Sequence, residues 1–257
     1  MLGDLVEKGG ISVVVPVFNS QKTLMELVDR LMKTLRDIDD EFEVILVNDG
    51  SSDRSWNMIE EIARSNPQVL GIELDRNYGQ SNAVVCGMAH SRYEILITMD
   101  DDLQHPPEEI PKLVKEASKG RFDVVYGRYQ RDTWPKALGS GFSNLLCQWL
   151  FKKPGRVILS SFAAFTPSVV EMLIKKEDLK PGIYGMVLSV TTRIGDVPVE
   201  YHPRRSGVRG YGVKLLLKIT LDNLLYSPIF SLFKIRSRGP AYTVRDYAGK
   251  IKQEKNN

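Results

Sequence analysis

One apolar run of the sequence ends abruptly in three carboxylates. Residues 95–99, Ile-Leu-Ile-Thr-Met, are followed by Asp100, Asp101 and Asp102, and a proline pair comes soon after. An apolar run that stops at charged and turn-forming residues is typical of a buried strand. Acidic groups at the carboxyl end of such a strand lie where open α/β sheets bind their ligands. The run therefore predicts a buried strand with a ligand site at its end.

The alternation of side chains along a strand predicts which carboxylates share a side. Asp100 and Asp102 are expected to point one way and Asp101 the other. Two carboxylates on one side suit Mg²⁺ or Mn²⁺, which keep several waters and share their remaining positions with substrate phosphates. Gln104 adds a neutral oxygen two residues further on. A solvated acidic turn that caps the next helix is the alternative interpretation.

Strands and helices alternate along the first half of the chain. This alternation predicts an α/β fold with a mostly parallel, doubly wound sheet. Later in the chain we expect a helix over residues 134–151 and an edge strand that begins near Val197. The early strands are expected at residues 11–19, 43–47, 69–74, 95–99 and 121–128, and the early helices at residues 23–35, 55–63 and 82–90.

The C-terminal part of the sequence differs in character from the rest. Residues 213–233 are largely apolar with a few charges, and basic residues follow as far as Arg238. We expect an amphipathic helix that either lies in a membrane interface or packs on the domain core. The chain is accordingly divided into a main domain (residues 1–212), this amphipathic segment (residues 213–238) and a polar, mobile tail (residues 239–257).

Composition excludes several classes of protein. A net charge of +3, with 42% hydrophobic and 26% charged residues, is that of an ordinary globular protein and gives no sign of nucleic-acid binding. Cys86 and Cys147 lack metal or redox spacing, and both are expected to be buried free thiols in a reducing compartment. Neither a signal-peptide core nor an uncharged run of 18 residues is present. The sequence therefore predicts a cytoplasmic protein that touches a membrane at most from its surface.

Two further loops carry polar groups at predicted strand ends. Asp49 follows the second strand and could accept hydrogen bonds from a base or ribose, while helix capping, by Asp53 or Ser52, is the alternative for this loop. The loop of residues 76–80 joins a strand to a helix and could line a sugar or diphosphate at the helix N-terminus, or be only a polar loop.

Basic residues form two more candidate anion sites. Arg204, Arg205 and Arg209 lie close together around Gly207, and guanidinium groups bind phosphate through paired donors. A solvated basic loop is the alternative. Lys136 and Ser140 are one turn apart on a predicted helix, so both could meet the same anion.

Taken together, these stretches resemble the family 2 glycosyltransferases, in particular the polyprenyl-phosphate glycosyltransferases related to dolichol-phosphate mannose synthase. The matching stretches occur in the family's order and span roughly residues 10–230; they are residues 13–19, 47–53, 76–80, 99–107, 127–128 and 204–207. The resemblance implies a GT-A fold, which is a Rossmann-like, mostly parallel sheet flanked by helices, here followed by the C-terminal amphipathic helix. It also implies a nucleotide-sugar donor and hexosyltransferase chemistry.

The resemblance assigns roles residue by residue. It implies catalytic roles for Asp101, Arg128 and Arg205. The implied donor-binding residues are Pro16, Phe18, Asn19, Asp49, Asp53, Arg76, Asn77, Gly79, Gln80, Asp100 and Asp101. The implied acceptor-phosphate residues are Arg128, Lys136, Ser140, Arg204 and Arg205. The implied ligands of a divalent metal, Mg²⁺ or Mn²⁺, are Asp100, Asp102 and Gln104.

The chain departs from the family pattern at several positions. Ser20 and Gln21 follow Asn19 where the family usually has Glu after the Asn, and Ser161 replaces an acid that is often assigned as a base or sugar-positioning residue. Arg209 stands where a serine is common. The transmembrane helices of many bacterial relatives are absent from this sequence.

The expected reaction is an inverting, metal-dependent transfer of a sugar to a polyprenyl phosphate, undecaprenyl or dolichyl, in cell-surface glycan synthesis. A lipid phosphate is already anionic and needs no strong base, so Ser161 would be tolerated. A hydroxyl acceptor would need a base, with Asp101 or Glu108 as candidates. A catalytically weak nucleotide-sugar-binding homologue is a further alternative. The expected location is the cytoplasm, with peripheral association at the inner face of the cell membrane left open, as is homo-oligomerisation.

Overall fold

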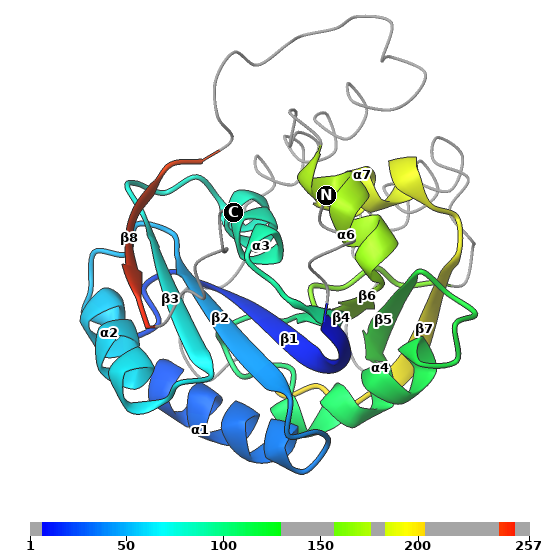
Figure 1. Ribbon diagram of the computed structural model, residues 1–257, viewed down its shortest axis with the longest axis horizontal. Helices are drawn as coiled ribbons and strands as arrows, with labels where there is room; N and C mark the ends of the chain where they lie inside the picture. Colours follow the sequence, from blue (N-terminus) through cyan, green and yellow to red (C-terminus); the bar gives the residue numbers. More distant parts are fainter. Residues whose placement is uncertain (1–6, 130–156, 176–182, 204–241, 250–257) are drawn as a thin grey trace, which may run out of the picture.

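A computed structural model of the 257-residue chain describes residues 7–129, 157–175, 183–203 and 242–249 (Figure 1). The described strands form one sheet of eight, in the order β7-β5-β6-β4-β1-β2-β3-β8. They are β1 (Glu7–Val17), β2 (Phe42–Asn48), β3 (Val69–Leu74), β4 (Tyr93–Thr98), β5 (Val124–Tyr129), β6 (Ala163–Phe165), β7 (Ile194–Val199) and β8 (Val244–Ala248).

Most of the sheet is parallel. Strand β1 pairs in parallel with both β2 and β4, β2 with β3, and β5 with β7. Strand β6 runs antiparallel between β4 and β5, and β8 runs antiparallel along β3. The predicted α/β fold with a mostly parallel sheet is therefore confirmed. Because the central strands are parallel, the loops that follow them gather at one edge of the sheet.

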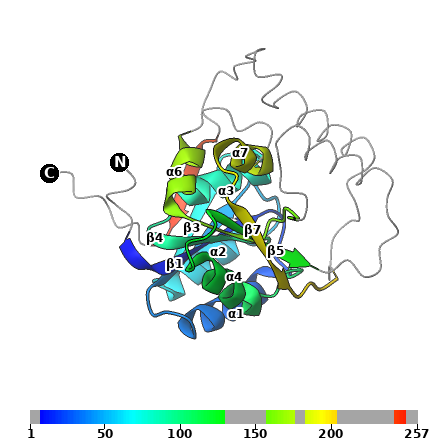
Figure 2. The same cartoon turned by 90° about the vertical axis from the view of Figure 1, so that its right-hand side faces the viewer.

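Helices cover both faces of the sheet (Figures 1 and 2). One face carries α1 (Leu24–Arg36), α2 (Ser55–Ser65) and α4 (Ile110–Ala117), the last preceded by the short 3₁₀ helix η2 (Pro107–Glu109). The other face carries α3 (Gln80–Ala89), α6 (Pro167–Ile174) and α7 (Ile183–Val190). All seven residues of β2 are buried, which explains its nearly continuous apolar sequence, since a strand covered on both faces has no solvent side.

Helix α1 shows how sequence spacing produces this packing. Leu24, Leu27, Leu31 and Leu35 recur at intervals of three and four residues, and none of them is exposed. This spacing places one apolar stripe on the side of the helix that meets the sheet. Burying each leucine contributes on the order of 2 kcal/mol to folding, so α1 is held mainly by this stripe.

Strand β4 is shorter than the sequence predicts. It ends at Thr98, and residues 101–105 follow as bends rather than as strand. The argument that Asp100 and Asp102 share a side because of strand alternation therefore does not apply to them. Their orientation is set by the turn that follows β4.

The C-terminal tail also differs from the expectation of a mobile segment. Val244–Ala248 form strand β8, which lies along β3 at the edge of the sheet, and Asp75 donates its N–H to the Thr243 carbonyl at 3.1 Å. Strand β7 is at the opposite edge, which confirms the predicted edge strand and fits Pro198, a residue that cannot donate to a neighbour.

Several predictions concern residues outside the described ranges. These are the helices expected at residues 134–151 and 213–233, the side chains of Lys136, Ser140, Arg204 and Arg205, and Cys147. Among the described residues, Cys86 is buried and unpaired, as predicted, and burial raises its thiol pKa to about 12. None of the described helices is both long enough and apolar enough to span a membrane.

Candidate active site

The loops that follow β1 and β2 bind to each other through side chains. Asn19 donates its N–H to the Ser51 hydroxyl at 3.0 Å, and its side-chain oxygen accepts the N–H of Ser52 at 2.9 Å. Asn19 has φ +55°, a left-handed conformation that asparagine tolerates better than most residues. The predicted donor-binding residue Asn19 therefore holds the two loops together.

Asp49 fixes the loop that follows β3. Its two carboxylate oxygens accept the backbone N–H groups of Tyr78 at 2.7 Å and of Gly79 at 2.9 Å. Burial raises the pKa of Asp49, although these two bonds oppose the rise. Gly50 packs against the backbone of Arg76 and Asn77 so closely that a Cβ would lie 2.5 Å from the Asn77 nitrogen. The loops after β2 and β3 thus form one unit.

Asp53 lies beside the start of helix α2. It accepts the N–H of Ser55 at 2.9 Å and the Ser55 hydroxyl at 2.5 Å, and it also accepts the N–H of Gln21 at 3.1 Å. Burial alone would raise its pKa, but the bonds from Ser55 and Gln21 outweigh burial and lower it. Asp53 therefore binds the first residue of α2 and ties this helix to the loop after β1, although the N-cap position itself is occupied by Arg54.

Asp101 points toward the loop after β1. Its Oδ2 atom accepts the N–H of Phe18 at 3.0 Å and a short hydrogen bond from the Ser20 hydroxyl, and its carbonyl accepts the Thr23 hydroxyl at 2.8 Å. Burial raises the pKa of Asp101, and the nearby Asp102 adds to the rise, while Ser20 and Phe18 oppose it.

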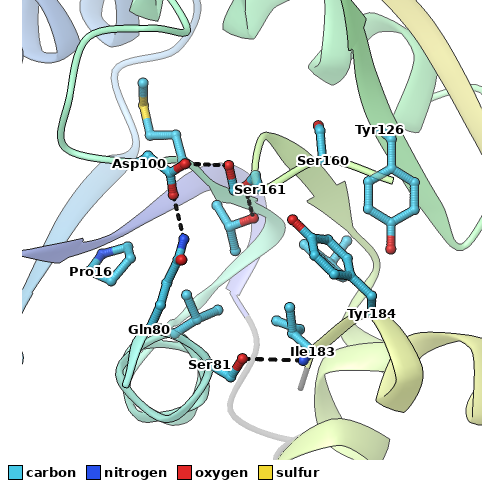
Figure 3. A pocket seen from close by; sticks show the side chains of 13 residues that line it. Pro16, Gln80, Ser81, Asp100, Tyr126, Ser160, Ser161, Ile183 and Tyr184 are labelled. Carbon is cyan, nitrogen blue, oxygen red and sulfur yellow. Dashed lines mark hydrogen bonds between the residues drawn. The ribbon is translucent and has the colours of Figure 1, made fainter. Parts of the chain in front are cut away.

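Asp100 lines a pocket (Figure 3). Its Oδ1 accepts the side-chain amide of Gln80 at 2.5 Å, and its Oδ2 accepts the hydroxyl of Ser161 at 2.6 Å. The ring of Pro16 lines the same pocket. Three predicted donor-binding residues, Pro16, Gln80 and Asp100, are therefore brought together, and Ser161 joins them.

The turn after Asp101 is strained and buried. Asp102 accepts the backbone N–H of Gln104 at 3.1 Å, and Leu103 between them has φ +61°, a conformation that costs a branched residue on the order of 1 kcal/mol. His105 is buried against Phe162 and Tyr201, and burial lowers its pKa to about 4. The imidazole is therefore neutral at physiological pH.

The oxygen atoms of this turn fit a magnesium or manganese ion. Asp100 and Asp102 supply carboxylate oxygens, which are hard ligands of the kind that Mg²⁺ and Mn²⁺ prefer. Among the described residues, no three His, Cys, Asp or Glu side chains cluster as a metal cage. The donor set therefore suits a cation that retains waters and shares its coordination with a substrate diphosphate.

Two predicted cations, Arg128 and Arg76, are not among the residues that line the pocket. Arg128, at the end of β5, donates its Nε to Asp196 of β7 at 3.0 Å, and its side chain is 40% exposed. Arg76 lies over the ring of Tyr78, with 4.8 Å between the guanidinium carbon and the ring centroid. Arg128 therefore has a fixed Nε and an accessible guanidinium face.

Sequence reasoning missed several residues of the pocket. Ser81, Tyr126, Ser160 and Tyr184 line it but were not selected from the sequence. For Tyr126 a signal existed, because it lies next to Gly127 on a predicted strand and faces one side of the sheet. The other three come from a helix start and from segments that no periodic pattern marked.

The family model described as "Glycosyl transferase family 2" matches residues 12–155. An undecaprenyl-phosphate 4-deoxy-4-formamido-L-arabinose transferase from Edwardsiella ictaluri is 34% identical over 215 residues, which are 82% of this chain. The chain spans 66% of the length of that relative.

Solved structures of glucosyl-3-phosphoglycerate synthase from Mycobacterium tuberculosis are similar in fold. One, in complex with Mn²⁺, UDP-glucose and phosphoglyceric acid, has a TM-score of 0.59 and 21% identity, and the match covers 84% of this chain and 78% of that one. Another, with Mn²⁺ and UDP-glucose, has a TM-score of 0.61 and 19% identity, with 97% and 92% covered. The GT-A fold expected from the sequence is thereby confirmed.

Proposed function

The chain belongs to glycosyl transferase family 2, and from this membership we propose that it transfers a sugar from a nucleotide-sugar donor to a polyprenyl phosphate. The name of the 34% identical relative pairs undecaprenyl phosphate with a sugar transferase, which supports this choice of acceptor. The transfer is metal-dependent and inverts the anomeric carbon. In this proposal the enzyme acts at the inner face of the membrane, where its lipid acceptor would be found.

The observation that carries this proposal is the convergence of loops at Asp100. The loops after β1, β2 and β3 are tied to one another by Asn19, Asp49 and Asp53, and Asp101 ties the first of them to the turn that contains Asp100. Such a preorganised edge can hold a nucleotide on one side of Asp100 and a sugar on the other.

In this mechanism the donor loops fix the nucleotide. Asp49 and Gly79 keep the start of α3 in place, so that the helix N-terminus and Arg76 face the diphosphate. Asp100, Asp102 and Gln104 would hold a divalent cation, which would neutralise the negative charge that develops on the leaving diphosphate.

The acceptor side uses positive charge rather than a base. A lipid phosphate oxygen is already anionic, so it attacks without losing a proton to the protein. Arg128 binds this phosphate with the part of its guanidinium that Asp196 leaves accessible. The other residues proposed to bind the acceptor phosphate are Lys136, Ser140, Arg204 and Arg205. This explains why a serine at position 161 is compatible with catalysis.

The test is turnover of purified protein with Mg²⁺ or Mn²⁺ and a panel of nucleotide sugars, with and without undecaprenyl phosphate in detergent. Release of nucleoside diphosphate is expected to depend on the lipid and to disappear in Asp102→Ala, whereas Asp246→Ala on the exposed edge strand β8 serves as a matched control. Metal-dependent donor binding without turnover on any lipid would contradict the proposed acceptor. It would favour a hydroxyl acceptor or a weakly active homologue.

A further inference from the structure

Strand β8 has an irregular pairing with β3 at the edge of the sheet (Figure 1). Just beyond the ladder, the Asp75 N–H donates to the Thr243 carbonyl at 3.1 Å. The register shifts near the end of β3, so that Arg245 is an extra residue between two paired residues of β8. An extra residue of this kind is a β-bulge, which changes the direction in which the neighbouring side chains point.

The bulge places Val244 and Tyr247 on the same face of the sheet. They pair with Leu74 and Ile72, which are two positions apart in β3 and belong to the core on the α3 side. Residues three positions apart in a regular strand point to opposite faces, so this arrangement depends on the extra residue. Both side chains are thereby directed to the face that carries α3.

The β8 segment, residues 242–248, contacts α3 at two places. The ring of Tyr247 lies 5.6 Å from that of His90, the residue that ends α3, and its hydroxyl is 3.2 Å from the His90 Nε2 atom. The Tyr242 hydroxyl is within hydrogen-bonding reach of the Cys86 thiol in the middle of α3. Tyr242 and Val244 also pack against the core cluster to which α3 contributes. The segment therefore joins α3 to the edge of the sheet.

Helix α3 and the loop before it form part of the candidate donor site. Asp75 immediately precedes the loop of residues 76–80, two of whose backbone N–H groups bind Asp49 at 2.7 and 2.9 Å. At the start of α3, Gln80 donates its side-chain amide to Asp100 at 2.5 Å. The N-terminus of α3 has no side-chain cap, so its position depends on what packs around the helix.

We propose that Tyr242 and Tyr247 are positioning residues, which hold α3 and the preceding loop in the geometry that binds the nucleoside diphosphate of the donor. Neither residue lines the pocket beside Asp100, so both act through α3 rather than on the donor itself. A helix that is already in place does not have to be ordered when the ligand binds, which favours affinity. This inference rests on the proposed function, because it assumes that the diphosphate lies at the start of α3.

The first test follows amide hydrogen exchange in the unmodified protein, with Mn²⁺ and a saturating concentration of UDP or GDP. Coupling between two sites is reciprocal, so a ligand that needs the β8 segment in place must also stabilise that segment. We expect slower exchange at residues 243–248 as well as at residues 76–80. Protection of residues 76–80 without any change at residues 243–248 would overturn the inference. Failure of both nucleotides to bind would overturn the proposed donor site, and this inference with it.

The second test measures nucleotide affinity by isothermal titration in variants of Tyr247. Tyr247→Ala removes the contact with His90, and we expect a loss of roughly three- to tenfold in affinity, with kcat at saturating donor within about twofold of the original value. Tyr247→Phe keeps the ring and should recover most of the affinity. Tyr247 is 40% exposed, so the truncated variant is expected to fold. Met172→Ala removes an equally exposed side chain from α6 and is the matched control.

Melting temperatures measured on the same variants separate a positioning role from a structural one. A lower melting temperature in Tyr247→Ala with unchanged nucleotide affinity would mean that the β8 segment only stabilises the fold, and would overturn the inference. An equal loss of affinity in Met172→Ala would overturn it as well. Tyr242→Ala repeats the measurement at the middle of α3, and unchanged affinity in this variant would refute the role of Tyr242.

Discussion

Asp101 and Ser20 join the metal-site turn to the first loop of the sheet, since the carboxylate of Asp101 accepts the hydroxyl of Ser20 and, on the same oxygen, the N–H of Phe18. The middle carboxylate of the acidic run thus faces a neighbouring loop, whereas Asp100 faces the pocket. The resemblance assigns Asp101 to catalysis and donor binding. Its contacts indicate that it would act on the donor through the position of the loop.

We predict that Asp101→Ala weakens donor binding about tenfold, because Phe18 and Ser20 lose their common acceptor and the loop loosens. The measurement is the donor KM together with the affinity for the nucleoside diphosphate. Ser20→Ala should give a smaller effect in the same direction. Because the two residues act through one contact, the double variant should resemble Asp101→Ala. Additive losses would show that Asp101 acts independently of Ser20.

A second prediction concerns Glu108, which was a candidate base for a hydroxyl acceptor. Arg30 holds both of its oxygens, at 2.9 and 2.6 Å, and the hydrogen bond from Arg30 lowers the pKa of Glu108. A carboxylate with a lowered pKa and two strong bonds is a poor base. We therefore expect Glu108→Gln to keep kcat within about twofold of the original value, whereas a drop of two orders of magnitude or more would restore Glu108 as the base.

The same variant has a pH signature. Because the folded pKa of Glu108 is depressed, its stabilising contribution is present above the unfolded value of 4.5 and is lost as the pH falls through the folded pKa. Its side chain is 53% exposed, so the contribution should stay below about 1 kcal/mol. Urea unfolding should show Glu108→Gln as slightly less stable at pH 7 and equal to the original protein in strong acid. Glu60→Gln, on the outer side of α2, is the comparison.

The sequence was most informative where a pattern repeats or a motif is local. The apolar spacing of α1 and the runs of β1 to β3 predicted their elements to within a few residues, because burial on known faces dictates those patterns. The acidic turn was located correctly, but its geometry was not, since β4 ends at Thr98 and Leu103 adopts a left-handed conformation. Such a turn is set by packing around it rather than by its own residues.

Long-range contacts were beyond sequence reasoning. Strand β6 has only three residues, and its place between β4 and β5 depends on two ladders with distant partners. The hydrogen bond from Ser161 to Asp100 joins residues that are 61 positions apart in the sequence. The hydrogen bond from Arg128 to Asp196 joins residues that are 68 positions apart. Ser161 was noticed only as a departure from a family pattern, and nothing in its own neighbourhood indicated which carboxylate it would meet.

A third prediction addresses the acceptor through Arg128 and Asp196. Asp196 fixes the Nε of Arg128, so Asp196→Asn should let the guanidinium move and raise the KM for the polyprenyl phosphate several-fold. Arg128→Ala should lower kcat/KM for the acceptor by roughly 10- to 100-fold, which is the loss of one charged hydrogen-bonding group. Neither change should alter donor affinity. An effect on the donor KM of the same size would place Arg128 on the diphosphate instead.

The last prediction concerns the hydroxyl of Ser161 and its bond to Asp100. Two of the hydrogen bonds to the Asp100 carboxylate come from the side chains of Gln80 and Ser161. Because Ser161→Ala removes the second of them, the orientation of the Asp100 carboxylate is less restricted in this variant. We expect a loss of roughly three- to tenfold in kcat/KM, with the metal concentration needed for half-maximal activity raised by a similar factor. Thermal stability should hardly change, because Ser161 is partly exposed.

Ser161→Asp is the informative counterpart of Ser161→Ala. It places a second carboxylate beside Asp100, and repulsion between the two should raise the pKa of one of them. Without metal the variant should therefore be less stable at pH 8 than at pH 5, because the ionised pair is penalised as the pH rises. Added Mn²⁺ should remove the difference by binding the pair. Higher turnover on undecaprenyl phosphate in Ser161→Asp than in the original protein would mean that an acid at position 161 takes part in the transfer after all, and that the serine limits the reaction.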